Sequence, residues 1–435
     1  MKIVSTLKPS AKFGWLLLAI FLVFLSFKHM KRHKYFSWEG PVWADVAGYF
    51  VYMPASLYYE WDGNRVPEAA VERLGMGFSL EENGIIRTKY TYGVALMQLP
   101  FYLVADVWVR WKEASAQPRG FSLTHQRAIM VAAIFWLILG LYWLGGWLSV
   151  RFSSTVIGFS LMAMLMGSHL WYYSIDSGGM SHVYSFALFA AVLRLLQRKW
   201  ELGWLLKHWL LFGFVSGLIV VIRPTNALFL LFAVLLWQGQ VQEIWPRLRS
   251  MLQPTGLILL ILAFGLALFP QLLYWKYAHG SWVYYSYQDE GFNWAKPQLI
   301  KFLFSPAGGL FWYAPVYWLV VPAWFRWRNE MQQQAMVWLL FTFVLLYVFS
   351  CWHNWRYGGG FGARVMIEYL VFAAVPMAYG FEYLLERGSS KRMGWAIGVF
   401  VVLVFWGLKL NYSFGRYFFG DGDWDWAYYA RMIFK

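Results

Sequence analysis

Long apolar runs separated by short polar segments occupy most of the chain. Four of these runs, at residues 13–27, 129–150, 256–274 and 395–410, approach or reach the ~20 residues that span a bilayer as a helix. The pattern predicts an all-α polytopic membrane protein, organised as a single integral membrane domain over residues 1–435. The first run has charged residues on both flanks and no small-residue cleavage site, so we expect a retained helix rather than a removed signal peptide.

The longest polar stretch, residues 28–127, interrupts this pattern near the N-terminus. It contains two candidate helices, at 45–61 and 90–111, and the second one decides the topology. Pro100 interrupts the second helix and Asp106 lies inside it, which favours a helix at the membrane interface over one that crosses. We therefore expect 28–127 to be a long first outer loop with interfacial helices.

Positive charge in the later hairpins supports this arrangement. If the N-terminus is inside and 90–111 does not cross, the short cytoplasmic loops collect Lys and Arg, as the positive-inside rule requires. These residues are Arg151, Arg194, Arg198, Lys199, Lys207, Arg247, Arg249, Arg326, Arg328, Arg387, Lys391 and Arg392. A crossing segment would place all of them outside, whereas the basic cluster at 28–34 counts against our choice. We expect about eleven transmembrane helices, with the loop at 352–364 and the tail at 412–435 on the outer side.

Composition narrows the class of protein. Hydrophobic residues make up 60% of the chain and aromatic residues 22%, whereas only 14% are charged, against about 25% in ordinary soluble domains. The net charge of +15 is divided among short clusters between apolar runs, so it sets topology rather than forming a basic face for nucleic acid. The single cysteine, Cys351, excludes an intramolecular disulfide and makes a Cys-based metal site implausible.

The first candidate for chemistry is Asp45, inside the aromatic segment 43–54. A carboxylate at a helix N-terminus is stabilised by free N–H groups and by the helix dipole, so Asp45 can serve simply as a helix cap. Alternatively, it is a general base that takes a proton from an acceptor hydroxyl while the acceptor attacks a sugar C1. The residue alone leaves both interpretations open.

A second candidate segment places Arg87, Lys89 and Tyr92 just before the expected interfacial helix. Lysine side chains near a membrane surface extend toward lipid headgroups, which explains this placement without any substrate. Alternatively, Arg87 and Lys89 neutralise a phosphate that lies at headgroup depth. We include Tyr92 in the same predicted binding segment.

An acid and a histidine, Asp176 and His182, lie in one glycine-containing turn between two expected helices. A histidine at a helix start is more often a cap or a hydrogen-bonded structural group than a ligand. Asp176 suits a second catalytic acid facing Asp45, for acceptor orientation or metal coordination. One Asp and one His do not make a metal signature, so we predict no metal ligands and no definite cofactor, while a divalent metal stays possible.

Arg223 breaks a long apolar stretch between about residues 205 and 237. The following Pro224 explains the break, but a charge at this depth is costly unless it faces water, a phosphate or a partner. We therefore predict that Arg223 binds a ligand.

The segment 352–364 contains aromatic residues, four glycines and two arginines. Its glycines let backbone N–H groups approach an anion, and the faces of Trp352 and Tyr357 can stack on sugar rings. Arg364 and Glu368 can pair if a helix begins there. An interfacial aromatic belt with a flexible loop is the alternative. We predict a substrate loop that includes Trp352, Tyr357 and Arg364, with Glu368 beside it.

Together these features resemble the GT-C superfamily of membrane glycosyltransferases, which includes the protein O-mannosyltransferases and the lipid A aminoarabinose transferase. Members carry an essential Asp in the first outer loop, and Asp45 in Trp-Ala-Asp-Val-Ala-Gly-Tyr is similar. Some place a Lys before an interfacial helix to hold the lipid phosphate, which Lys89 in Lys-Tyr-Thr-Tyr-Gly resembles. Asp176 corresponds to an acid in the second outer loop, and Arg223 to an arginine that binds the phosphate.

The resemblance covers most of the chain in architecture but only short motifs in sequence. Asp45 is not followed directly by a second acid, as it is in the O-mannosyltransferases. Lys89 lacks the two prolines that follow the corresponding lysine in the aminoarabinose transferase. Both departures leave the donor sugar and the acceptor open.

The resemblance implies a multi-pass glycosyltransferase of the bacterial inner membrane, with its active site facing the periplasm or outside. Its donor would be a polyprenyl-phosphate-linked sugar and its acceptor a lipid, glycan or protein, and the chain shows no P-loop pattern for a nucleotide. Asp45 would be the general base, Lys89 and Arg223 would stabilise the phosphate leaving group, and 352–364 would close on donor or acceptor. The alternative is a transporter or flippase of a lipid-linked intermediate, which should hold ionisable groups near the bilayer midplane.

Overall fold

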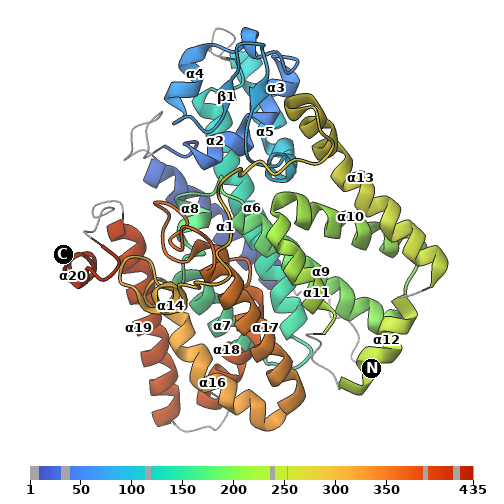
Figure 1. The fold of residues 1–435 in the computed structure, drawn as a ribbon. Coiled ribbons are helices and arrows are strands. Elements are labelled where there is room, and N and C mark those ends of the chain that lie inside the picture. Colours follow the sequence, from blue (N-terminus) through green and yellow to red (C-terminus); the bar gives the residue numbers. More distant parts are fainter. Residues whose placement is uncertain are drawn as a thin grey trace. The chain divides into compact units, whose positions relative to one another are not determined.

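A computed structural model describes most of the chain (Figure 1). The described residues are 9–30, 40–112, 119–235, 241–251, 253–385, 390–414 and 422–434. Most of the basic cluster predicted at 28–34, Arg387 and part of the tail at 412–435 lie outside them. Backbone contacts divide the chain into two compact units, which are described separately. Unit 1 comprises residues within 1–139, 173–184 and 277–280, and unit 2 comprises residues within 140–172, 185–276 and 281–435.

Almost all of the regular secondary structure in the described chain is helical, which confirms the predicted all-α class. In order, the first ten helices are α1 (Pro9–Met30), α2 (Asp45–Phe50), α3 (Tyr52–Leu57), α4 (Glu68–Arg73), α5 (Gly93–Lys112), α6 (Leu123–Leu148), α7 (Ser154–Met166), α8 (Tyr172–Ile175), α9 (His182–Leu202) and α10 (Leu206–Ile222). The next ten are α11 (Ala227–Ala233), α12 (Ile244–Met251), α13 (Pro254–His279), α14 (Leu299–Phe304), α15 (Leu310–Tyr313), α16 (Val316–Glu330), α17 (Gln332–Ser350), α18 (Leu370–Leu385), α19 (Ser390–Phe414) and α20 (Trp426–Phe434). One small antiparallel hairpin pairs β1 (Ser79–Leu80) with β2 (Ile86–Arg87).

Four helices in the described ranges, α6, α13, α17 and α19, are long and apolar enough to cross a membrane. Several shorter apolar helices accompany them, among them α7, α10 and α18. The architecture is therefore that of a polytopic membrane protein, while the predicted number of about eleven spans stays a prediction.

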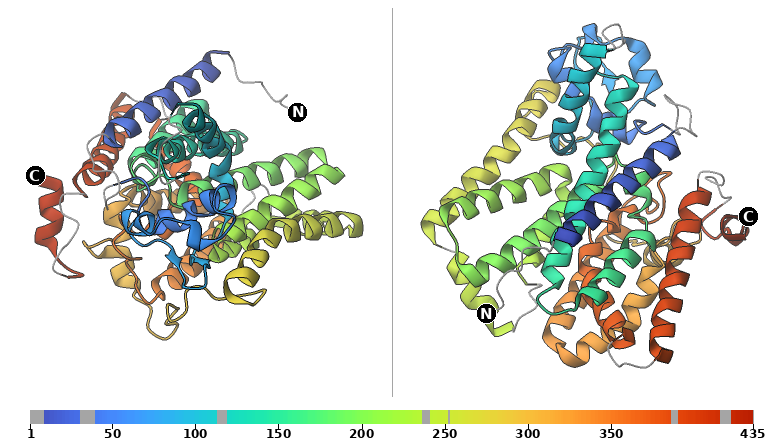
Figure 2. Two further views of the ribbon diagram at one scale, coloured as in Figure 1. Left: turned by 90° about the horizontal axis from the view of Figure 1, so that it is seen from above. Right: turned by 180° about the vertical axis from the view of Figure 1, so that it is seen from behind.

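In unit 1, the short elements between residues 40 and 112 lie together (Figures 1 and 2). The single helix expected at 45–61 is wrong, because the chain forms α2 and α3 and then turns through Glu60 and Trp61, which both have positive φ. Pro54 contributes to this break, since it has no N–H to bond the carbonyl one turn earlier. The helix expected at 90–111 is confirmed as α5, and it is not among the four candidate spans.

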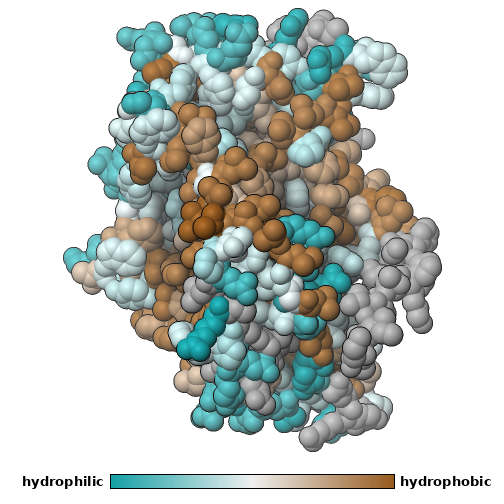
Figure 3. Space-filling model, turned by 90° about the vertical axis from the view of Figure 1, so that its right-hand side faces the viewer, coloured by the Kyte–Doolittle hydropathy of each residue, from teal (hydrophilic) through white to brown (hydrophobic). Residues whose placement is uncertain are grey.

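In unit 2, α18 is buried along almost its whole length among α7, α16 and α19. In contrast, α13 exposes large apolar side chains. They are Leu257, Ile258, Ile261, Leu262, Leu266, Phe269 and Leu273. Figure 3 shows exposed apolar side chains gathered across the middle of one face of the molecule. Apolar side chains on a helix of this length suit contact with lipid hydrocarbon.

Two glycines let α10 approach α13 closely in unit 2. A Cβ at Gly213 would overlap the carbonyl oxygen of Leu260, and one at Gly217 would lie 2.7 Å from the carbonyl oxygen of Phe264. Small residues four positions apart are the usual device for close helix packing in membranes, where the hydrophobic effect does not drive helices together.

We therefore expect Gly213→Val to separate α10 from α13 and to destabilise the detergent-solubilised protein. Overpacking costs about 1–3 kcal/mol, which lowers the unfolding temperature by roughly 2–4 °C per kcal/mol in a chain of a few hundred residues. Thermal unfolding measures the effect. Gly265→Ala on α13 is the control, because a Cβ there meets nothing within 4 Å; equal melting temperatures for the two variants would contradict the packing argument.

Candidate active site

In unit 1, Asp45 occupies the first turn of α2 and is bonded to a residue far along the chain. The hydroxyl of Tyr90 donates a hydrogen bond to Oδ1 of Asp45, across 45 residues of sequence. The residue that precedes the helix, Ala44, has a φ of 45° and makes no side-chain capping bond. The carboxylate therefore has a specific side-chain partner, which the capping interpretation of Asp45 does not require.

The segment that carries Tyr90 is fastened to α2 and α3 by its neighbours. The Thr88 hydroxyl donates to the Gly48 carbonyl at 3.0 Å, and the Tyr52 hydroxyl donates to the Tyr90 carbonyl at 2.8 Å. The ammonium group of Lys89 lies 5.7 Å from the centroid of the Tyr90 ring. A carboxylate, a phenol and an ammonium group are thus held in one part of unit 1.

The approach of Tyr90 to α2 depends on Gly48. A Cβ at this position would overlap the Tyr90 ring and would lie 2.6 Å from the carbonyl oxygen of Gly77. The ring of Tyr49 lies beside Tyr90 as well, with centroids 4.6 Å apart. Only glycine leaves room at 48 for the ring whose hydroxyl reaches Asp45.

The turn that carries Asp176 packs against α5 and α2. Gln98 on α5 donates from Nε2 to the Gly179 carbonyl at 3.3 Å, and the Tyr184 hydroxyl donates to the Gly178 carbonyl at 2.9 Å. A Cβ at Gly179 would overlap Val46, the residue that follows Asp45. The structure therefore brings the turn after α8 to the start of α2, as the prediction of two cooperating acids requires.

Burial changes the pKa of the Asp176 carboxyl group in this turn. It raises the pKa of Asp176 well above the ordinary value of an aspartate, because the charged form is poorly solvated there. His182 opens α9 and is buried, with its ring 4.8 Å from that of Tyr173. Asp176 is thus poised to exchange a proton nearer to neutral pH than an exposed acid.

Arg87 and Tyr92 take different positions in unit 1. The Arg87 guanidinium donates to the Ala278 carbonyl at 3.3 Å and lies 3.5 Å from Glu81. These bonds give Arg87 a structural role, and its predicted contact with phosphate stays a prediction. Tyr92 lies beside Tyr52, with ring centroids 6.5 Å apart, and burial raises the pKa of Tyr92 to about 12.

In unit 2, Arg223 ends α10 and pairs with Glu368. Its Nη1 donates to Oε1 of Glu368 at 3.1 Å, where Glu368 is 1% exposed and Arg223 20% exposed. The Tyr369 hydroxyl donates to the Thr225 carbonyl at 3.3 Å, which joins the same two segments. A buried carboxylate needs such a counter-ion, and Arg223 keeps part of its surface accessible beside it.

Tyr357 lies within electrostatic reach of this pair. Burial raises the pKa of Tyr357, while Arg223 and Arg364 lower it and Glu368 raises it further. Its hydroxyl donates to the Phe349 carbonyl at 2.8 Å. The structure thus brings together four of the residues predicted for the substrate site.

The loop at 352–364 is held by its own aromatic residues. The rings of Trp352 and Tyr357 are stacked with centroids 6.2 Å apart, and Trp352 also contacts Phe292 at 4.9 Å. Tyr357 is 8% exposed. Of the two aromatic rings expected to stack on a sugar, the ring of Tyr357 therefore supports the loop instead. Gly362, with a φ of 63°, leaves no room for a Cβ, which would lie 2.6 Å from Tyr313.

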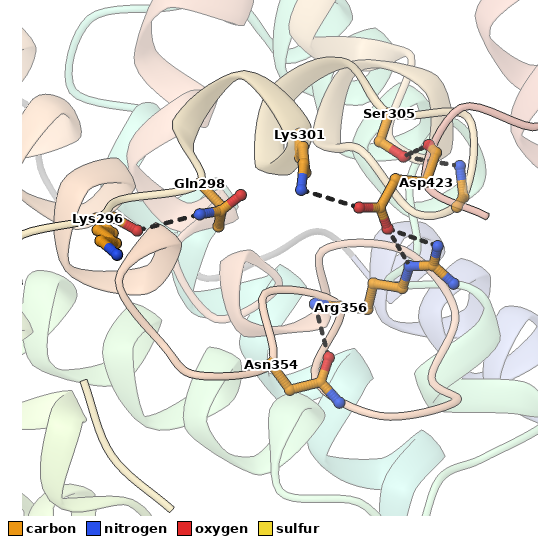
Figure 4. A network of polar contacts seen from close by, with 8 residues as sticks. Lys296, Gln298, Lys301, Ser305, Asn354, Arg356 and Asp423 are labelled. Atoms are coloured by element: carbon orange, nitrogen blue, oxygen red, sulfur yellow. Dashed lines mark hydrogen bonds and ion pairs between the residues drawn. The ribbon is translucent and has the colours of Figure 1, made fainter. Parts of the chain in front are cut away.

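A group of charges in unit 2 was not predicted from the sequence. We call it the Asp423 cluster, and it consists of Lys301, Arg356 and Asp423 (Figure 4). Asp423 lies 3.0 Å from the Lys301 ammonium group and accepts from Arg356 at 2.6 and 3.1 Å. Burial raises the pKa of Asp423, but the bonds from Lys301 and Arg356 outweigh it and hold that pKa below its usual value.

Two site residues, Tyr90 and Asp423, were not predicted, because their neighbours in the sequence give little indication of a role. Tyr90 lies beside Lys89, but nothing near it in sequence indicates a bond to Asp45. Asp423 lies in the C-terminal tail between two other aspartates, Asp421 and Asp425, so nothing in the sequence distinguishes it. In the ranges that the structure describes, no group of three or more His, Cys, Asp or Glu side chains could hold a metal ion.

Comparison with known proteins identifies the fold. No family model matches the sequence, and no curated protein sequence matches it. The structure is similar to the crystal structure of ArnT from Cupriavidus metallidurans in the apo state, with a TM-score of 0.52, 14% identity, and 97% of this chain and 69% of that chain covered. It is similar also to the Archaeoglobus fulgidus oligosaccharyltransferase in the apo form, with a TM-score of 0.52, 10% identity, and coverage of 97% and 60%. At these identities the likeness shows the fold alone, and the predicted architecture of an all-α polytopic membrane protein is confirmed.

The fit between Gly48 and Tyr90 generates a direct test. We expect Gly48→Ala to push the Tyr90 ring away from Asp45 and to destabilise the protein by about 1–3 kcal/mol. Thermal unfolding of the purified variant measures the cost. Gly158→Ala on α7, where a Cβ meets nothing within 4 Å, should unfold at the temperature of the wild type or slightly above it. Unchanged unfolding of Gly48→Ala would show that the ring does not lie where the structure has it.

The raised pKa of Asp176 predicts a pH trend in stability. A carboxyl group whose pKa is raised on folding favours the folded state at pH below its unfolded value of about 3.9 and loses that contribution as pH rises through the folded pKa. Asp176→Asn should therefore gain in unfolding temperature relative to the wild type between pH 4 and pH 8. Glu82→Gln, at an exposed position of the same unit, is the control for removing a surface carboxylate. A constant difference between wild type and Asp176→Asn across this range would refute the burial argument.

Proposed function

We propose that the chain is a glycosyltransferase that moves a sugar from a polyprenyl-phosphate-linked donor to an acceptor at the outer face of the bacterial inner membrane. The observation that carries the proposal is the bond from Tyr90 to Asp45 beside Lys89. The fold, which is similar to those of ArnT and an oligosaccharyltransferase, supports the same conclusion. The acceptor class, whether lipid, glycan or protein, is open.

Asp45 acts as the general base in this proposal. The acceptor hydroxyl oxygen attacks C1 of the donor sugar, the bond from C1 to the phosphate oxygen breaks, and the hydroxyl proton passes to the Asp45 carboxylate. The bond from Tyr90 fixes the orientation of that carboxylate, as the third member of a catalytic group orients its base.

Lys89 stabilises the departing polyprenyl phosphate. Negative charge grows on the phosphate as the bond to C1 breaks, and an ammonium group fixed in place lowers the free energy of that state. In unit 2, Arg223, whose guanidinium is 20% exposed beside Glu368, is proposed to bind a phosphate. Phosphate is a good leaving group, so this chemistry does not require a metal.

The remaining predicted residues orient the substrates. Asp176 and His182 are proposed to position the acceptor, because their turn packs against the start of α2. Arg87 and Tyr92 border the Lys89 segment. In unit 2, Trp352, Tyr357, Arg364 and Glu368 are proposed to form the surface of the substrate loop and its support.

The test is transfer by purified protein supplied with a polyprenyl-phosphate sugar, measured for the wild type and two variants. Asp45→Asn removes the base and should lower the rate by roughly 10²–10⁴-fold. Tyr90→Phe keeps the ring but removes the bond to a charged group, which is worth about 1.5–3 kcal/mol, and should lower the rate by roughly 10–10²-fold.

Asp62→Asn, at an acid of the same unit that accepts only local bonds from Asn64, is the control and should transfer at the wild-type rate. Gel filtration establishes that each variant is folded. Full activity of folded Asp45→Asn would remove the catalytic assignment.

A further inference from the structure

Three segments of unit 2 meet at one carboxylate, that of Asp423. Lys301 lies on α14, Arg356 lies in the loop at 352–364, and Asp423 lies just before α20. Figure 4 shows the side chains of Lys301 and Arg356 directed to Asp423 from opposite sides. Arg356 and Asp423 are 67 residues apart in sequence, so this contact is a feature of the fold.

Asp423 is held by its backbone as well as by its side chain. The Ser305 hydroxyl donates to the Asp423 carbonyl oxygen, and the Ala307 N–H donates to the Ser305 oxygen at 3.1 Å. Arg356 donates both Nε and Nη2 to one carboxylate oxygen, which fixes the plane of its guanidinium. Because both its backbone and its side chain are bonded, Asp423 is suited to hold the loop in one position.

The segment after Asp423 is anchored independently of the loop. Asp425 accepts from the Tyr428 N–H at 2.8 Å, which closes the first turn of α20. The Trp406 indole donates to the Tyr429 hydroxyl at 2.7 Å, and that hydroxyl donates to the Trp312 carbonyl at 3.2 Å. Asp423 therefore connects an anchored helix to the loop.

Arg356 lies just before the glycine run 358–360 of the loop. Gly358 has a φ of 75°, a Cβ there meets nothing within 4 Å, and Gly358 and Gly359 are exposed. Glycine residues allow the backbone to bend easily, so the position of the run depends on what holds its two ends, and one of these is its start. On that side, Tyr357 is bonded to Phe349 and Arg356 to Asp423.

We propose that Asp423 is a positioning residue of the transfer site: through Arg356 it sets the place of the glycine run, and so the binding of substrate. This inference rests on the proposed function. The side chains of the cluster are 28–36% exposed, and ion pairs at such exposure contribute little to stability. Loss of the cluster therefore changes substrate binding more than it changes folding.

The experiment compares Asp423→Ala, Asp423→Glu and the control Asp425→Asn, which changes the carboxylate of the same segment that accepts from the Tyr428 N–H. One measurement is transfer kinetics, and the other is the rate at which a thiol reagent labels Gly359→Cys in a Cys351→Ser background. We expect Asp423→Ala to raise KM about tenfold, with kcat within about twofold of the wild-type value. We also expect the reagent to label Gly359→Cys about fivefold faster in this variant, because the glycine run is released. Asp423→Glu should have a KM and a labelling rate close to those of the wild type, and Asp425→Asn should match the wild type in both.

Unchanged labelling of a folded Asp423→Ala would overturn the proposal, because the run would then be held by other contacts. Faster labelling with unchanged KM would overturn it too, since the loop would move without affecting substrate. An equal effect of Asp425→Asn would assign the result to the tail as a whole. If the wild type transfers no sugar, the proposed function fails, and the labelling still decides whether Asp423 holds the loop.

Discussion

The site in unit 1 depends on the hydrogen bond between Tyr90 and Asp45. The bond requires that two segments 45 residues apart approach closely, and Gly48 is the position that permits it. Thr88 and Tyr52 then fix the backbone on either side of Lys89. A carboxylate, a phenol and a cation are thereby placed by packing and hydrogen bonding.

Unit 2 holds charged side chains in largely apolar surroundings. Arg223 would be costly at the end of an apolar helix, and the nearly buried Glu368 supplies its partner. Removing Arg223 would take this counter-ion from a carboxylate that is 1% exposed, which is more destabilising than the loss of a surface pair. The Asp423 cluster is more exposed and so has less effect on stability, which leaves it suited to hold the loop.

Much of the fold followed from the sequence, because apolar runs near the length of a bilayer crossing identify helices directly. Asp45 and Lys89 could be selected as well, since a charge beside an apolar segment needs a reason. Tyr90 could not, because its role depends on a long-range contact and Tyr92, two positions later, offers the same side chain. Tyr357 was selected as a sugar-stacking residue, yet its burial on Trp352 depends on how the loop folds. In sequence, Asp423 resembles the neighbouring Asp421 and Asp425, and only the fold places Arg356 beside it.

The account's central claim is that the chain breaks the bond between a sugar and a polyprenyl phosphate. The most direct measurement is mass spectrometry of a reaction that contains the purified protein in vesicles, a polyprenyl-phosphate sugar and an envelope extract as the source of acceptor. The account predicts that free polyprenyl phosphate appears in step with the glycosylated acceptor. Intact donor that crosses the bilayer without release of polyprenyl phosphate would contradict it and would identify a transporter instead.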